Sequence, residues 1–106
     1  MDKREDLILE LKRFKKDLSS YIPIKKMILF GSQARGKTHK WSDVDLLIVS
    51  DKFRRKKSFK RSRGFYKYWN LYYPVDFLCY TPEEFNKLKK QFTMVREALR
   101  NGIEVK

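Results

Sequence analysis

Apolar residues recur along the chain at two spacings, and each spacing predicts a different kind of element. Over residues 2–20 they occur at every third or fourth position, which is typical of an amphipathic helix. The positions concerned are Leu7, Leu11, Phe14 and Leu18. Short apolar runs follow at residues 27–30, 46–49 and 74–80, and each ends at a glycine, serine or threonine. Runs of this length before turn-forming residues indicate the strands of a small sheet.

The chain after the third run predicts two further helices. Thr81 can cap the first of them, Pro82 fits its first turn, and Glu84 can bond back to the capping residue. Its apolar face would consist of Phe85, Leu88 and Phe92. Residues 93–99 predict a final helix, and residues 103–105 a short strand or tail. This mixture predicts an α+β fold in which helices flank a small sheet.

Between the second and third runs the chain is strongly basic. From Lys52 to Arg63, the basic segment, there are eight lysines and arginines and no acidic residue. One interpretation is a contact surface for nucleic acid or for an acidic protein. The other is a solvated helix face or loop without a partner.

A densely aromatic stretch follows the basic segment at residues 64–73. Roughly helical spacing predicts that one set of rings packs on the sheet: Phe59, Tyr66, Trp69 and Tyr73. A second set would then face elsewhere: Phe65, Tyr68 and Tyr72. Because one small core needs fewer rings, the second set predicts an interface or a base-stacking surface, with a fully buried helix as the alternative.

The first apolar run ends at Gly31 and Ser32, which predicts a turn able to hold phosphate. Gly31 has no Cβ, so a triphosphate can approach the backbone closely. Ser32 can cap a short helix that runs through Arg35, and a helix start attracts anions. Arg35 and Lys37 are either triphosphate contacts or surface charges. Ser42 either turns the chain or bonds a phosphate.

The second and third runs carry three aspartates. Asp43 and Asp45 are two residues apart, so on a strand both side chains point from one face while Val44 points into the core. Asp76 is the only charged residue in residues 74–80, and an unpaired charge in an apolar strand is costly. We therefore expect Asp76 beside the other two. Clustered carboxylates repel one another, and their oxygen ligands favour Mg²⁺ or Mn²⁺.

These residues together resemble a known signature. Gly31-Ser32, ten intervening residues, Asp43-Val44-Asp45 and a later lone aspartate look like the polymerase-beta-type nucleotidyltransferase superfamily. Within it, the segments GSQARG, SDVDLLIV and VDFLCYTPEEF are similar to the minimal nucleotidyltransferase (MNT) proteins. The resemblance covers roughly residue 24 to the C-terminus and implies a polymerase-beta-like fold with a small, twisted, mixed sheet. MNT proteins are commonly encoded beside a HEPN-domain partner as a toxin–antitoxin pair.

The resemblance also implies roles and a reaction. The nucleotide-binding residues would be Gly31, Ser32, Arg35 and Ser42. The catalytic residues, which would hold two Mg²⁺ ions or Mn²⁺ in their place, would be Asp43, Asp45 and Asp76. The implied reaction transfers AMP from ATP, or another nucleoside monophosphate, to a hydroxyl on a HEPN-type toxin. Related enzymes that act on antibiotics or RNA carry a second domain for the acceptor, and this chain has no residues to spare for one.

Composition narrows the class of protein. The 106 residues predict a single domain, residues 1–106, that needs no disulfide. The lone Cys79 is expected in the core, and the single histidine, His39, in solvent. No apolar run approaches the roughly 20 residues of a membrane span and the N-terminus is charged, so we expect a cytoplasmic protein. The net charge of +13 predicts attraction to nucleotides, RNA or an acidic partner.

Two other functions stay open on these grounds. A non-catalytic antitoxin would use its aromatic and basic surface only to bind a partner, and replacing all three aspartates would leave protection intact. A nucleic-acid-binding module would bind through the basic segment with a steep dependence on salt. The base of the nucleotide, the acceptor and the oligomeric state do not follow from the sequence.

Overall fold

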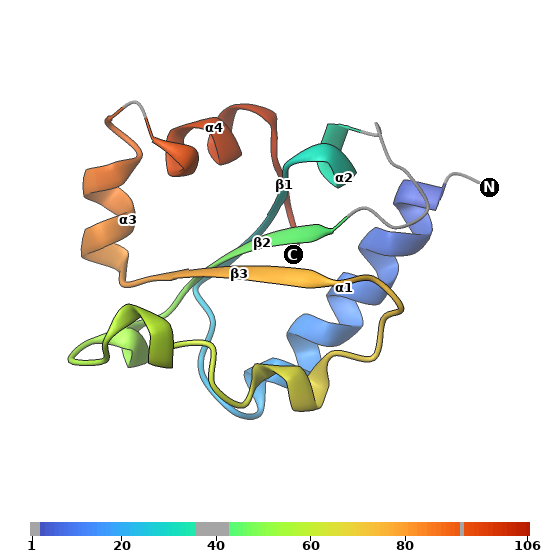
Figure 1. Ribbon diagram of the computed structural model, residues 1–106, viewed down its shortest axis with the longest axis horizontal. Coiled ribbons are helices and arrows are strands. Elements are labelled where there is room, and N and C mark those ends of the chain that lie inside the picture. The colour runs from blue at the N-terminus through green and yellow to red at the C-terminus, as the bar shows by residue number, and fades with distance from the viewer. Residues whose placement is uncertain (1–2, 36–42, 92) are drawn as a thin grey trace.

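The computed structural model describes residues 3–35, 43–91 and 93–106 (Figure 1). The helices are α1 (Lys3–Ser19), α2 (Ser32–Arg35), α3 (Pro82–Leu88) and α4 (Met94–Asn101). The strands are β1 (Lys26–Phe30), β2 (Val44–Val49), β3 (Val75–Tyr80) and β4 (Ile103–Glu104). Three 3₁₀ turns, η1 (Asp51–Phe53), η2 (Ser58–Lys60) and η3 (Phe65–Tyr68), connect β2 to β3. The predicted strands and helices outside residues 52–73 are therefore confirmed to within a few residues.

The four strands form one mixed sheet in the order β3-β2-β1-β4. β1 is antiparallel to both of its neighbours, whereas β2 and β3 are parallel. Parallel neighbours need a long crossover connection, which residues 50–74 supply. Val44 lies beside Val75, and Val49 lies beside Tyr80. The N-terminal ends of β2 and β3 therefore meet at one end of the sheet.

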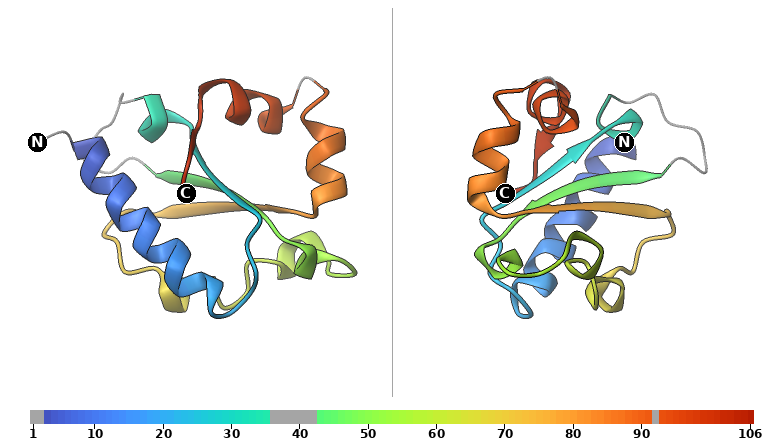
Figure 2. Two further views of the ribbon diagram at one scale, coloured as in Figure 1. Left: turned by 180° about the vertical axis from the view of Figure 1, so that it is seen from behind. Right: turned by 60° about the vertical axis from the view of Figure 1, so that its left-hand side comes forward.

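Helix α1 covers one face of the sheet, and α3 and α4 cover the other (Figures 1 and 2). The predicted apolar stripe of α1 is buried: Leu7, Leu11, Phe14 and Leu18. It packs against the side chains that β1 and β2 direct to this face of the sheet, including Leu29, Leu46 and Ile48. The alternate side chains point to the other face, where Ile28, Leu47 and Val49 pack against α3 and α4. The alternation along each strand thus divides the buried side chains between two cores.

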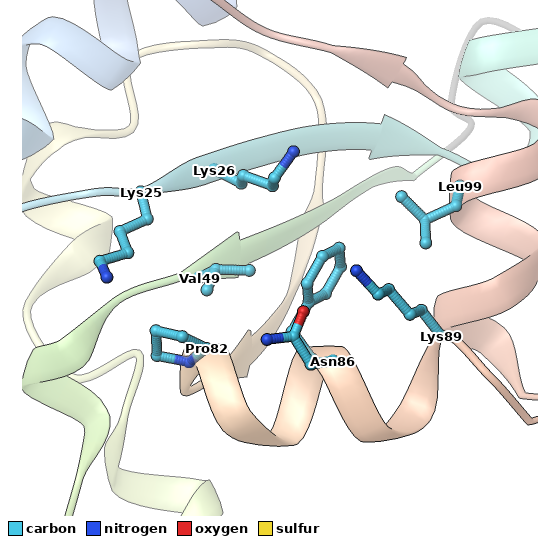
Figure 3. Close-up of a pocket in the computed structure, with 8 residues that line it drawn as sticks. Lys25, Lys26, Val49, Pro82, Asn86, Lys89 and Leu99 are labelled. Atoms are coloured by element: carbon cyan, nitrogen blue, oxygen red, sulfur yellow. The ribbon is translucent and has the colours of Figure 1, made fainter.

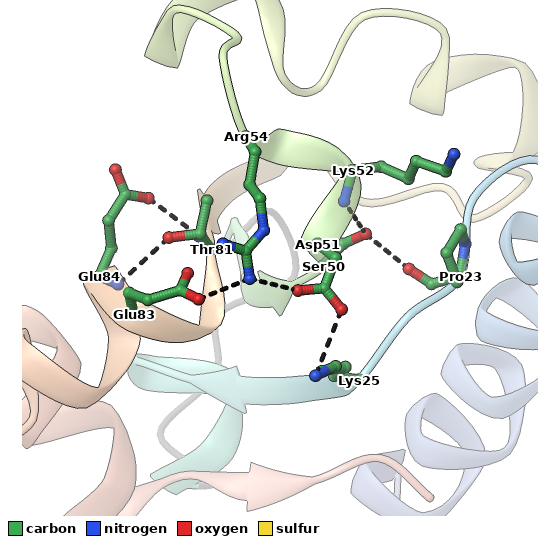
Figure 4. A network of polar contacts seen from close by, with 9 residues as sticks. All are labelled: Pro23, Lys25, Ser50, Asp51, Lys52, Arg54, Thr81, Glu83 and Glu84. Atoms are coloured by element: carbon green, nitrogen blue, oxygen red, sulfur yellow. Dashed lines mark hydrogen bonds and ion pairs between the residues drawn. The ribbon is translucent and has the colours of Figure 1, made fainter.

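The start of α3 follows the sequence prediction. The hydroxyl of Thr81 accepts a hydrogen bond from the backbone N–H of Glu84, and the Glu84 carboxylate accepts one from the N–H of Thr81. This reciprocal pair is a capping box, shown in Figure 4. Phe85 and Leu88 face the core as expected, and Phe92 lies outside the described residues.

Buried Arg61 fixes the crossover to the sheet. Its guanidinium donates to the backbone carbonyls of Lys56 and Cys79, each at 3.0 Å, and to the Glu84 carboxylate. The Arg61 side chain is only 9% exposed, so its charge is satisfied by these acceptors rather than by water. One of the eight cations of the basic segment is therefore a structural anchor.

A second set of ion pairs joins η1 to the start of α3 (Figure 4). Arg54 pairs with Asp51 at 2.7 Å and also with Glu83. Asp51 pairs in addition with Lys25 at 3.2 Å, just ahead of β1. These groups are about half exposed, so each pair contributes little to stability, but together they define where the crossover leaves the sheet.

The predicted assignment of the aromatic rings was wrong in part: it is confirmed for Trp69, Tyr72 and Tyr73 and wrong for Phe59, Phe65, Tyr66 and Tyr68. The stretch forms separate 3₁₀ turns rather than one α-helix, because Gly64 adopts a left-handed backbone conformation with φ +90° between them. Phe65, predicted to face away, is 1% exposed in the core. Phe59 and Tyr66, predicted to pack on the sheet, are 73% and 59% exposed. Trp69, Tyr73 and Tyr68 are half-buried against the α1 core, and Tyr72 is fully exposed.

Two expectations drawn from composition can be compared with the structure. Cys79 is a free thiol, half-buried in β3, and burial raises its pKa to about 12, so it stays protonated and unreactive at neutral pH. None of the described helices is both long enough and apolar enough to cross a bilayer.

Candidate active site

Pairing of the parallel strands brings two of the three aspartates together. Asp45 is the second residue of β2 and Asp76 the second residue of β3, and the strand register places them side by side. On parallel strands, paired residues point to the same face of the sheet. Asp45 and Asp76 therefore lie side by side, as expected from the sequence, and point toward the face that carries α3 and α4.

Burial and the charges of the other two aspartates act together on Asp45. Partial burial raises the pKa of the Asp45 carboxyl, and the charges of Asp76 and then Asp43 raise it further. Asp43 precedes β2 and is exposed, as is Asp76. Asp45 is thus a half-buried carboxylate with two negative neighbours, which is an arrangement that a bound cation would relieve.

Asp76 differs from the prediction in its degree of burial. It was expected to be a costly charge within an apolar strand, but it is exposed because it lies at the open end of β3. Val44, expected in the core, is fully buried. The desolvated member of the cluster is therefore Asp45 rather than Asp76.

Gly31, directly after β1, adjoins the same carboxylate. Its backbone has a φ of +77°, a conformation that residues with a side chain rarely adopt. A Cβ at this position would collide with Oδ2 of Asp45 and lie 3.3 Å from its Cγ. Glycine was predicted here because a phosphate could approach its backbone closely. The structure adds a second reason: the carboxylate of Asp45 occupies the space that a side chain at this position would need.

Helix α2 follows Gly31 at once and extends the turn. Its backbone begins at Ser32, in agreement with the short helix predicted there. The side chains of Ser32 and Arg35 lie outside the described part of the structure, as do Ser42, Lys37 and His39. Their predicted contacts with a nucleotide therefore stay predictions.

Two residues of α2 that the sequence analysis left unassigned fix this helix in place. Gln33 and Ala34 are each 3% exposed, and Ala34 belongs to the α1 core. The small apolar Ala34 is a weak signal for such packing, whereas nothing in the sequence marks Gln33 for burial. Burial of these two side chains fixes α2 against the domain directly after Gly31.

The donor chemistry of the cluster fits a divalent cation. Carboxylate oxygens are the ligands that Mg²⁺ and Mn²⁺ prefer. Within the described residues, however, no three His, Cys, Asp or Glu side chains are arranged so that they could hold an ion as they stand. The raised pKa of Asp45 reflects proximity rather than a closed ligand shell. The residues therefore fit a divalent cation by their donor type and by the strand register.

A comparison with known families decides what kind of domain this is. Residues 11–102 match the sequence model of the family described as nucleotidyltransferase domain. The chain belongs to this family. The match spans the turn at Gly31 as well as Asp43, Asp45 and Asp76, so the predicted nucleotidyltransferase assignment is confirmed at the level of the domain.

Individual relatives of this nucleotidyltransferase domain agree with the assignment. A protein from Methanocaldococcus jannaschii named "Putative protein adenylyltransferase" is 48% identical over 46 residues. That alignment covers 42% of this chain and 46% of the relative, so the chain matches less than half of that protein's length. A crystal structure of a "putative nucleotidyltransferase" from Sulfolobus solfataricus superposes with a TM-score of 0.67 at 20% identity. The superposition covers 95% of this chain and 80% of the S. solfataricus chain, and it confirms the nucleotidyltransferase fold.

A pocket of about 440 Å³ lies at the other end of the domain (Figure 3). It is lined by Lys25 and Lys26 at the start of β1, by Phe85 and Lys89 of α3, and by Leu99 of α4. In an antiparallel pair the start of β1 lies at the end of β2, so this pocket and the carboxylates occupy opposite ends of the sheet. The pocket is therefore not part of the candidate active site.

Proposed function

We propose that this nucleotidyltransferase domain transfers AMP from ATP to a hydroxyl group on a partner protein. The observation that carries the proposal is the register of β2 and β3, which sets Asp45 beside Asp76 and next to the Gly31 turn. Carboxylates beside a glycine turn combine ligands for a divalent cation with a backbone that a triphosphate can approach. The family match supports the reaction class, and the name of the M. jannaschii relative supports a protein acceptor.

In this proposal each residue of the site has one task. Asp43 and Asp45 hold two Mg²⁺ ions, for which Mn²⁺ could substitute, and Asp76 completes the site nearest the acceptor. Gly31 lets the triphosphate approach the backbone, while Ser32, Arg35 and Ser42 contact its phosphates. When bound, the metal ions lower the pKa of the acceptor hydroxyl and neutralise charge at the α-phosphate. The protein residues themselves hold the α-phosphate and the acceptor hydroxyl in the orientation that the reaction requires.

The acceptor in this proposal is a HEPN-type toxin, which transfer of AMP would inactivate. This part rests on the resemblance of the segments GSQARG, SDVDLLIV and VDFLCYTPEEF to minimal nucleotidyltransferases. A partner-borne acceptor is also consistent with the relative's name, which specifies protein as its substrate. The domain would then act as the antitoxin of the pair.

The test is transfer of label from ATP to the product of the neighbouring gene. With Mg²⁺ present, label at the α-phosphate should become attached to the acceptor, whereas label at the γ-phosphate should not. Asp43→Asn and Asp76→Asn should each abolish transfer, because a neutral amide is a poor ligand for Mg²⁺. Asp17→Asn, on the exposed face of α1, is the matched control and should transfer normally.

The same experiment separates the proposal from its competitor. If the wild-type protein protects against the toxin without any transfer, and the two variants protect equally well, the domain acts by contact alone. Transfer that persists in Asp76→Asn would show that the site has been assigned to the wrong residues.

A further inference from the structure

The basic segment presents most of its charge to solvent. Arg54 and Arg61 are paired with carboxylates, as described above. The other six cations are exposed: Lys52, Arg55, Lys56, Lys57, Lys60 and Arg63. No acidic residue interrupts them in the sequence. Six exposed positive charges within 12 residues create a local field that attracts polyanions.

The segment is fixed to the body of the domain at several points. Phe53, at its start, is 1% exposed in the core. Ser50, buried just before it, donates to the carbonyl of Pro23 at 2.6 Å and accepts from the N–H of Lys52. Arg61, near its end, bonds to β3 and α3. A surface held in this way loses less conformational freedom on binding than a free tail would.

One aromatic ring is exposed among these cations. Phe59 is 73% exposed and therefore contributes little to the core. The ammonium of Lys60 lies 5.9 Å from the centre of its ring. A flat apolar ring beside cations is the combination that binds single-stranded nucleic acid, since bases stack on the ring while phosphates pair with the charges.

We propose that the basic segment, with Phe59 as its stacking platform, is a binding site for single-stranded nucleic acid. An acidic protein would be attracted by the same charges, but it would gain nothing specific from an exposed phenyl ring among them. Unpaired bases do gain from it, because every base has a face that can stack. The observations therefore favour nucleic acid over an acidic protein.

The proposed site is separate from the carboxylates. Asp45 lies near the start of β2 (Val44–Val49), whereas the basic segment begins three residues beyond the end of that strand, so the two lie toward opposite ends of the sheet. Figure 1 shows how the chain leaves β2 at that end. The four residue steps from Asp45 to Val49 span roughly 13 Å of extended strand, and the basic segment begins beyond them. A nucleic acid on the basic segment would therefore leave the aspartates open, and the domain could bind both ligands at once.

Fluorescence anisotropy with a labelled 20-nucleotide RNA, and with DNA of the same sequence, tests the proposal in EDTA and without ATP. Lys56→Gln/Lys57→Gln/Lys60→Gln should weaken binding at least tenfold at 100 mM salt. It should also reduce the slope of log K against log salt by about 2, since each phosphate contact on a single strand contributes about 0.7. The control, Lys12→Gln/Arg13→Gln/Lys16→Gln on exposed α1 positions, removes the same charge and should weaken binding less than threefold. A difference between the RNA and DNA arms identifies which of the two the site prefers.

A second variant tests the role of the ring. Phe59→Leu should weaken binding of RNA or DNA about fivefold or more and leave binding of heparin, a polyanion without bases, unchanged. Asp76→Asn should leave nucleic-acid binding within twofold, so failure here is distinct from failure of the proposed transfer reaction. Three results would each overturn the proposal. They are an equal loss of nucleic-acid affinity in the two triple variants, no effect of Phe59→Leu, and tighter binding of polyglutamate than of nucleic acid. Melting temperatures close to the wild type would confirm that all variants are folded.

Discussion

Asp45 lies half-buried between two other carboxylates, and its charge therefore opposes folding. Burial and the charges of Asp76 and Asp43 raise its pKa above the ordinary value of 3.8. A folded protein that binds a proton more tightly than the unfolded chain becomes less stable as pH rises through the interval between the two pKa values. At neutral pH the domain thus retains a side chain that weakens it, which is typical of residues kept for function.

Asp45→Asn should raise the melting temperature of the metal-free protein at pH 7. The substitution removes the buried charge and its repulsion while keeping the size of the side chain. The gain should shrink as the pH is lowered toward 3.8 and below, where the wild-type carboxyl is protonated in both states. Thermal unfolding in EDTA at pH 7 and at pH 3.5 measures both effects. A variant less stable than wild type at pH 7 would contradict this reading of Asp45.

Gly31→Ala should impair the site and the fold together. The alanine must adopt a φ of +77°, which costs about 1–2 kcal/mol, and its Cβ would displace the Asp45 carboxylate. Nucleotide binding, measured by titration calorimetry, should be lost. Gly64→Ala is the matched control, because it has a similar strained φ of +90° but its Cβ would meet the hydroxyl of Tyr21 instead. If both variants lose stability equally and both retain nucleotide binding, Gly31 has no special relation to Asp45.

At the scale of elements, the sequence predicted the parts whose signals are local. The stripe of α1, the apolar runs of β1 to β3 and the capping box at Thr81 each depend on residues within a few positions of one another. The aromatic rings of the crossover were predicted only in part, because the shape of this connection depends on Arg61 reaching the carbonyl of Cys79 and the carboxylate of Glu84. Contacts between residues 18 and 23 positions apart leave no periodic trace in the sequence.

The candidate site divides in the same way. Its aspartates and its glycine could be identified from spacing. From the sequence, Asp76 could be expected beside Asp45 only because a lone charge in an apolar strand is costly outside a shared site. In the structure their proximity arises from the register of two parallel strands. The expected burial of Asp76 was wrong, since Asp76 is exposed and Asp45 is the partly buried residue.

Glu84→Gln should weaken the attachment of the crossover to α3. The hydrogen bond from Arg61 is the main cause that lowers the pKa of Glu84 below its usual 4.5, so this pair stabilises the fold above that pH and the effect is lost as pH falls through the lowered value. Because glutamine can still complete the capping box, the substitution isolates the charge. We expect the free energy of unfolding to fall by at most about 1 kcal/mol at pH 7, because solvent screens the partly exposed carboxylate, and to be unchanged near pH 3.

Urea denaturation at the two pH values measures this difference. Glu83→Gln is the control, since Glu83 is exposed and pairs with the exposed Arg54. Its effect should be smaller than that of Glu84→Gln. Equal effects of the two substitutions, or a loss from Glu84→Gln that persists at pH 3, would show that Arg61 does not hold the crossover through this carboxylate.

At the scale of the whole molecule, charge is separated along the sheet. The three aspartates lie at the start of β2 and β3, and the basic segment follows the end of β2. The aspartates thus form a local negative site on a protein whose net charge is +13. Such a background steers an anionic nucleotide toward the domain from a distance, while the aspartates require that a cation accompany it.

The central claim is that these aspartates bind a nucleotide together with a divalent cation. Titration calorimetry with a non-hydrolysable ATP analogue, in Mg²⁺ and in EDTA, tests it most directly. We predict that Mg²⁺ strengthens binding at least tenfold in the wild type and in the control Asp17→Asn, and that Asp45→Asn abolishes this gain. Binding that is equally tight in Mg²⁺ and EDTA, or a gain that survives in Asp45→Asn, would contradict the claim.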